Sequence, residues 1–95
     1  MDLYTTAIIP GNLYRMPESS TQGHLLYSNN FRAISILAPS DIFMVLSASQ
    51  YGHTDYLSVQ ILLKNTVLYI LSDEHEYCRI GENLYFHSNF IIPWK

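Results

Sequence analysis

A strict alternation of side chains near the middle of this chain constrains its fold more than any other feature. Every second position from 57 to 63 is apolar, at Leu57, Val59, Ile61 and Leu63. A period of two residues is typical of a β-strand that has one face buried. The sequence therefore predicts a strand over Tyr56–Leu63, with these four side chains on one face and Val59 and Ile61 buried in the core.

The residues after this strand predict a hairpin. Lys64-Asn65 is a two-residue turn, since Asn tolerates a positive φ, and Thr66–Leu71 then returns as a second strand. A two-residue turn also defines which residues face each other. The predicted cross-strand pairs are Leu63 with Thr66, Ile61 with Leu68, and Val59 with Ile70, and this register brings the apolar faces together.

A third strand is predicted before the hairpin. Ile42–Ser47 is rich in β-branched, aromatic and long aliphatic residues, and Tyr51–Asp55 then breaks the run with turn formers. Simple alternation predicts two faces, one with Ile42, Met44 and Leu46, the other with Phe43, Val45 and Ser47. We expect the three strands to form one antiparallel meander.

The remaining chain consists of short strand-like segments between turns, and the polar segment Pro17–Gly23 is an expected exposed loop. Ser72 is placed to cap a single helical turn before the acidic residues that follow it. We expect about six to eight short strands with helix limited to a turn or two, which is the pattern of an all-β barrel or sandwich. The strand-like segments are Leu3–Ile9, Leu13–Met16, His24–Tyr27, Phe31–Leu37, Tyr77–Ile80 and Leu84–Ile92.

Length and charge exclude several classes of protein. With 95 residues we expect one domain, 1–95. The formal net charge is -3 and the five basic residues are scattered, so neither a nucleic-acid footprint nor a polybasic membrane patch is expected. Met1–Ile9 contains no basic residue, so we do not expect a signal peptide. The single cysteine, Cys78, excludes an internal disulfide framework and favours the reducing cytoplasm.

The order of these segments resembles an SH3-like barrel over about residues 8–80. The resemblance rests on the Pro-Gly-x-Leu-Tyr motif at Pro10–Tyr14, the long loop after it, the Ile42–Leu46 strand, the Tyr-Leu-x-Val motif at Tyr56–Val59, the tight hairpin turn, and Leu68–Ile70. It implies a small barrel, to which residues 81–95 are added as an extra strand packed on the barrel or on a second copy.

The chain departs from the peptide-binding SH3 domains of signalling proteins. It lacks the Ala-Leu-Tyr-Asp-Tyr opening, and its only tryptophan is Trp94 rather than a residue of the middle strand. Binding of proline-rich peptides is therefore not implied. The tyrosine- and asparagine-rich, motif-poor composition also resembles that of small uncharacterised bacteriophage proteins.

Residues with catalytic or metal-binding chemistry do not form a recognisable motif. His75-x-x-Cys78 has acidic neighbours, but zinc sites use four ligands in spaced pairs, and the other histidines are isolated. Cys78 lacks the local signature of a nucleophile. Asp55 and the acids of residues 73–76 would form paired carboxylates only if folding brought them together. We expect no catalytic residue, metal or cofactor.

Tyrosines are the strongest functional candidates, because Tyr is enriched at protein interfaces. Tyr14, Tyr51 and Tyr56 fall near loop ends, where an SH3-like barrel exposes its groove, and Trp94 is the fourth candidate for partner binding. The alternative for each is a role in the core or its rim.

The sequence favours a non-enzymatic protein-interaction module, such as a phage or mobile-element accessory protein that binds a host or viral protein or associates with itself. Two alternatives stay open: a structural subunit of a larger particle or homo-oligomer, and a small ligand-binding barrel or enzyme. The aromatic-rich segment Leu84–Ile92 is too apolar for a free tail. We expect it to pair with the barrel or to form a homodimer.

Overall fold

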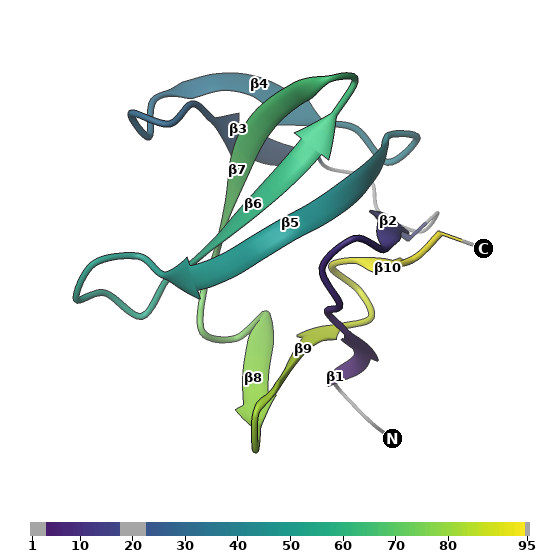
Figure 1. Ribbon diagram of the computed structural model, residues 1–95, viewed down its shortest axis with the longest axis vertical. Coiled ribbons are helices and arrows are strands. Elements are labelled where there is room, and N and C mark those ends of the chain that lie inside the picture. The colour runs from purple at the N-terminus through teal and green to yellow at the C-terminus, as the bar shows by residue number, and fades with distance from the viewer. Residues whose placement is uncertain (1–3, 18–22, 95) are drawn as a thin grey trace.

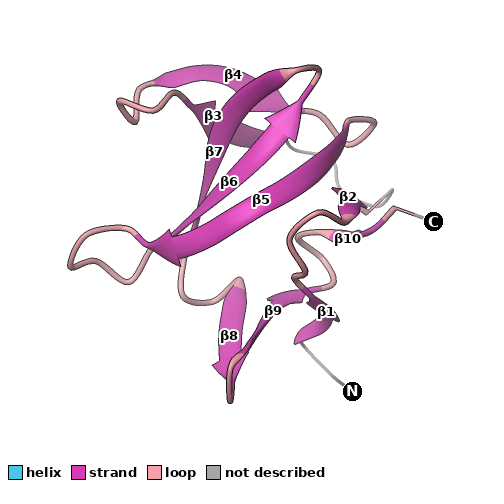
Figure 2. Cartoon of the chain, viewed as in Figure 1, coloured by secondary structure: helices cyan, strands magenta, loops and turns pink. Residues whose placement is uncertain are grey.

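The computed structural model describes residues 4–17 and 23–94, and in these ranges the protein is all-β, as predicted. Figure 2 shows strands and loops only. Nor do these ranges contain a helix long and apolar enough to cross a membrane. Most of the predicted loop Pro17–Gly23 lies outside them. The strands are β1 (Tyr4–Ala7), β2 (Leu13–Arg15), β3 (His24–Tyr27), β4 (Ala33–Leu37), β5 (Ile42–Gln50), β6 (Leu57–Leu63), β7 (Thr66–Ser72), β8 (Tyr77–Ile80), β9 (Asn83–His87) and β10 (Ile92–Pro93).

The strands form two antiparallel sheets (Figure 1). The larger sheet has the order β10-β2-β5-β6-β7-β3-β4, and the smaller has the order β1-β9-β8. In Figure 1, β4 lies at the top of the molecule and the smaller sheet lies at the bottom. The two outermost strands of the larger sheet are therefore β10 and β4, which matters for the surfaces described below.

The central meander β5-β6-β7 has the predicted register. Leu63 pairs with Thr66, Ile61 with Leu68, and Val59 with Ile70. The turn residues Lys64 and Asn65 have φ values of 50° and 65°. Positive φ at both central residues is the geometry that joins two strands whose twist is right-handed. Sequence alternation and turn chemistry thus agree, and the prediction is confirmed.

One prediction about β5 is wrong. Alternation puts Phe43, Val45 and Ser47 on one face, but Phe43 and Val45 are buried whereas Ser47 is exposed. The pairing with β6 shifts between Val45 and Ser47, because a β-bulge inserts one residue there. Each residue after the bulge therefore lies on the face opposite to the one that simple alternation assigns. The strand also continues to Gln50, three residues past its predicted end.

The carboxyl-terminal segment folds into this chain as two strands rather than one. β9 lies between β1 and β8, and β10 pairs with β2 at the edge of the larger sheet. Side chains alternate between the two faces of β9, since Leu84 and Phe86 are buried while Tyr85 and His87 are partly exposed. Residues 81–94 are therefore part of the core-forming structure and not an addition to a finished barrel.

The hydrophobic core lies between the inner face of the larger sheet and residues of the carboxyl-terminal segment. The ring centroids of Phe86 and Phe90 lie 5.1 Å apart, and those of Tyr77 and Phe86 lie 6.2 Å apart. The larger sheet contributes aliphatic side chains that are fully buried, including Leu26, Val45 and Ile61. Burial of this apolar surface is the main source of stability.

Candidate interaction surface

Tyr14, one of the four sequence candidates, is a core residue. Its side chain is only 1% exposed. Its hydroxyl donates a hydrogen bond to the Ala7 carbonyl oxygen (3.0 Å) and accepts one from the Ile9 N–H (2.8 Å). The expectation that this ring is exposed at a groove is wrong, because the tyrosine joins β2 to the connection that precedes it.

Tyr51, a second candidate, belongs to a group of aromatic rings on the outer face of the larger sheet. The ring of Phe31 lies 4.7 Å from that of Tyr51 and 5.3 Å from that of Tyr69, centroid to centroid. Tyr27 pairs with Tyr69 across β3 and β7, on the same face. All four are partly exposed. We call Tyr27, Phe31, Tyr51 and Tyr69 the aromatic patch.

Phe31 has an unusual backbone conformation, with a φ of 58°. A positive φ is rare for a bulky residue and costs on the order of 1–3 kcal/mol. The turn that imposes it is built on Ser28, whose carbonyl oxygen accepts from the Phe31 N–H (2.8 Å) and whose hydroxyl accepts from the Arg32 N–H (3.4 Å). The turn lies at Ser28-Asn29-Asn30, where the sequence predicts one, but the predicted strand Phe31–Leu37 starts two residues too early, since β4 begins at Ala33.

Hydrogen bonds between side chains hold Tyr69 in place. Gln60 donates from Nε2 to the Tyr69 hydroxyl (3.1 Å) and accepts from the Ser47 hydroxyl at Oε1 (3.1 Å). These three residues lie side by side on β7, β6 and β5, in one cross-strand row. The bulge in β5 is what turns Ser47 to this face. The ring on which Phe31 rests is therefore fixed by the sheet itself.

The two remaining candidates, Tyr56 and Trp94, are exposed but have no ring contact with the patch in the described residues. Tyr56 closes the loop that begins at Tyr51, since the Tyr51 N–H donates to its carbonyl oxygen (2.9 Å). Trp94 lies past β10, where its N–H donates to the Leu13 carbonyl oxygen (3.0 Å). Of the four sequence candidates, only Tyr51 belongs to the patch.

A second exposed apolar surface lies at the outermost strand β4. Its sequence is Ala-Ile-Ser-Ile-Leu, and its first four residues are exposed. Ile34 and Ile36 are both large and exposed, and Leu25, which pairs with Ile36 on β3, is exposed as well. We call β4 together with Leu25 the β4 edge.

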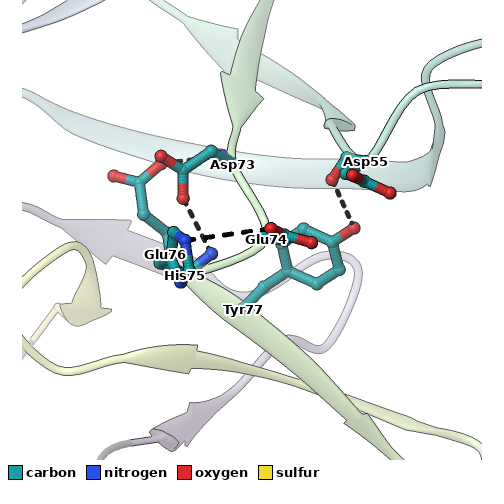
Figure 3. Close-up of polar contacts among 6 residues, drawn as sticks. All are labelled: Asp55, Asp73, Glu74, His75, Glu76 and Tyr77. Carbon is teal, nitrogen blue, oxygen red and sulfur yellow. Dashed lines mark hydrogen bonds and ion pairs between the residues drawn. The ribbon is translucent and has the colours of Figure 1, made fainter.

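Acidic residues gather in the turn between β7 and β8 (Figure 3). Asp73, rather than the predicted Ser72, closes this turn: its Oδ1 accepts from the His75 N–H (2.7 Å), and its own N–H donates to Oε1 of Glu76 (2.9 Å). Ser72 lies in β7, and its hydroxyl is buried without a hydrogen-bond partner among the described residues. Burial is the main cause that raises the pKa of Glu76.

The same region contains His75 and Cys78, for which the sequence predicts no metal site. Figure 3 shows the Tyr77 hydroxyl bonded to the Asp55 carbonyl oxygen (2.9 Å), so the loop before β6 lies next to this turn. Within the described ranges, no group of three or more His, Cys, Asp or Glu side chains has a geometry that could hold a metal ion. Cys78 is a free, half-buried thiol in β8. The absence of zinc stays a prediction.

A small cleft of about 170 Å³ lies between β5 and the β8–β9 hairpin. Val45 and Leu84 form part of its apolar lining, and Arg79 and Glu82 supply one charge of each sign. Neither Cys78 nor a histidine lines it. A nucleophile beside a base would have favoured the enzyme alternative, and this cleft provides no such pair.

Comparisons with known proteins provide no relative for this chain. No protein family model, no curated protein and no solved structure matches it. The two surfaces defined above are therefore interpreted from their own geometry.

Proposed function

We propose that this chain is a non-enzymatic protein-interaction module that binds its partner through the aromatic patch. The observation that carries the proposal is Phe31, a bulky residue with a positive φ whose ring lies against two tyrosine rings on an outer sheet face. Strained residues are retained where the surrounding structure requires them, and they cluster at binding and switch sites. Tyrosine and phenylalanine are also enriched at interfaces.

The patch suits recognition of a protein surface. Its rings combine apolar area with hydroxyl groups that can form hydrogen bonds, and Tyr69 is already fixed by Gln60. A fixed ring loses little conformational entropy when a partner covers it. The resemblance to bacteriophage proteins makes a host or viral protein the first partner to test, and the lone thiol suits the reducing cytoplasm.

An alternative role for Phe31 is to cover the outer face of the sheet as a small secondary core. Substitution with glycine separates the two roles, because glycine adopts a positive φ without strain. If the ring serves binding, Phe31→Gly removes the partner contact while relief of strain offsets much of the lost packing. If the ring serves packing, the variant loses stability.

The experiment is affinity capture from a lysate of the source cells, with the tagged chain as bait, followed by quantitative identification of bound proteins. We expect the wild type and Trp94→Ala to capture the same partner, and Phe31→Gly and Tyr51→Ser to lose it. Urea unfolding should place Phe31→Gly within about 1 kcal/mol of the wild type. Undiminished capture by Phe31→Gly, or a stability loss above about 2 kcal/mol, would contradict the proposal.

A further inference from the structure

Three of the four outermost strands, β8, β10 and β4, differ in how they are protected against pairing with another chain, and the fourth, β1, has four residues against the five of β4. β8 carries Arg79, and β10 is two residues long and includes Pro93. A charge, a proline or a very short strand are the usual devices that block pairing at an open edge. β4 has five residues without charge, proline or glycine, and two exposed isoleucines. It is thus an unprotected edge.

We propose that β4 pairs antiparallel with β4 of a second copy of this chain, around a two-fold axis through Ser35. Such pairing joins the two larger sheets into one continuous sheet and satisfies the edge backbone groups of both copies. Identical strands are self-complementary in this orientation, as a two-fold interface requires. Ile34 of one copy then lies opposite Ile36 of the other, and the Leu25 side chains lie beside them.

The charge distribution favours a second copy of this chain as the partner that pairs with β4. In the described ranges most carboxylates lie in the loops at residues 55, 73–76 and 82, toward the smaller sheet, which is the end of the molecule far from β4 (Figure 1). Two anionic copies that meet at β4 therefore keep these acids apart, and repulsion between them is screened beyond about 8–10 Å. The strand that must pair is itself uncharged.

Two residues just outside β4, Arg32 and Asp41, carry opposite charges that this pairing brings closer together. Arg32 of one copy then lies at the end of the interface near Ala38 of the other, beyond the regular ladder. The Ala38 N–H is bonded to Oδ2 of Asp41 (2.8 Å), so that carboxylate lies at the end of the strand, where Lys64 approaches it at 3.8 Å. Arg32 has no carboxylate partner within its own chain among the described residues. Pairing thus brings a free guanidinium toward a carboxylate at both ends of the interface.

A β-bulge near the start of β4 limits how far the new ladder extends. The pairing with β3 shifts between Ala33 and Ser35, while Ser35, Ile36 and Leu37 stay in regular register. Bulges increase the local twist and shorten a usable edge. The contact is therefore small compared with the roughly 1,200–2,000 Å² of a stable interface, and the dimer dissociates on dilution.

Sedimentation velocity over a range of concentrations tests this pairing. Ile36→Lys places a charge in the edge, and Ile80→Lys is a matched control, since both isoleucines are 61% exposed and lie in outermost strands. We expect the wild type and Ile80→Lys to shift from monomer to dimer as concentration rises. Ile36→Lys should lower the association constant at least about tenfold, and circular dichroism should confirm that it is folded.

Crosslinking tests the register. In a Cys78→Ser background, Ser35→Cys places the two new thiols across the axis, at a Cα separation of about 4.5–5.5 Å that a disulfide spans. Ser49→Cys, exposed in β5, is the control. We expect a covalent dimer from the first variant only.

Four results would overturn the inference. A wild-type protein that stays monomeric at every concentration would exclude self-pairing and leave the edge to another protein, and a ladder of larger oligomers would exclude a closed dimer. Equal effects of Ile36→Lys and Ile80→Lys, or equal crosslinking of both cysteine variants, would exclude β4 as the contact. No residue of the aromatic patch lies in β4, although Tyr27 pairs with Ala33 at its start, so loss of partner capture in Phe31→Gly is scored separately from these four results.

Discussion

Truncation of Ile61 to alanine tests the central claim about the fold. Ile61 is fully buried at the middle of the larger sheet, opposite Val45 on β5 and Leu68 on β7. The change removes three carbon atoms, worth about 0.8 kcal/mol each, or roughly 2.4 kcal/mol of transfer free energy. A residual cavity adds to this cost, because neighbours paired in a sheet on both sides cannot collapse freely. We expect a loss of about 3–4 kcal/mol, within the range of roughly 2–5 kcal/mol for such truncations.

Urea unfolding followed by circular dichroism measures this loss as a lower midpoint with an unchanged slope. Ile80→Ala is the control, because Ile80 is an isoleucine in a strand but is 61% exposed, and its truncation should change stability by at most about 0.5 kcal/mol. If Ile61→Ala cost less than about 1 kcal/mol, the assignment of the inner and outer faces of β6 would be reversed, and the core described above would be refuted.

Tyr14→Phe removes a hydroxyl that donates one hydrogen bond and accepts another, so the free energy of unfolding should fall by about 1–3 kcal/mol. An unchanged urea midpoint would show that neither hydrogen bond contributes to stability. Burial raises the pKa of Glu76 above its ordinary 4.5, so the folded state binds this proton more tightly than the unfolded state does. The resulting stabilisation is fully present below the ordinary pKa and is lost as pH rises through the raised pKa of the folded state. Glu76→Gln should therefore be more stable than the wild type near pH 7, with a difference that shrinks on acidification; a difference independent of pH would contradict this. Deletion of Gly81–Lys95 removes core residues and should give insoluble or unfolded protein, and a soluble, equally stable product would show the segment to be dispensable. Elemental analysis of the untagged protein should find no zinc, whereas stoichiometric zinc lost on Cys78→Ser would overturn that prediction.

The sequence was informative about the fold where side-chain period and turn chemistry agree. The register of β6 and β7 followed from the alternation and from the Lys64-Asn65 turn, since a two-residue loop leaves one pairing that buries both apolar faces. The bulge in β5 could not be predicted, because an inserted residue leaves the local composition unchanged. Only contact with the partner strand shows that Ser47 faces outward.

The candidate site was less accessible to sequence reasoning, because it depends on contacts between distant segments. Tyr14 and Tyr51 are chemically alike and both lie near loops, yet one bonds to the backbone in the core and the other packs on Phe31. The turn at Ser28 determines where Phe31 points. A local signal for a turn was present, but the ring's neighbours come from β5 and β7, which no local pattern identifies.

The pairing of β1 with β9 has a consequence for how the protein is made. Residues 4–7 pair with residues 85–87, whereas the meander β5-β6-β7 uses only neighbours in sequence. During synthesis the meander can form as soon as it leaves the ribosome, but β1 must wait until nearly all of the described chain has followed it. Contacts between segments so far apart slow folding. Until the carboxyl-terminal segment arrives, the core side chains of the nascent meander lack Phe86 and Phe90, which belong to the same buried cluster, and are exposed to aggregation or to chaperones.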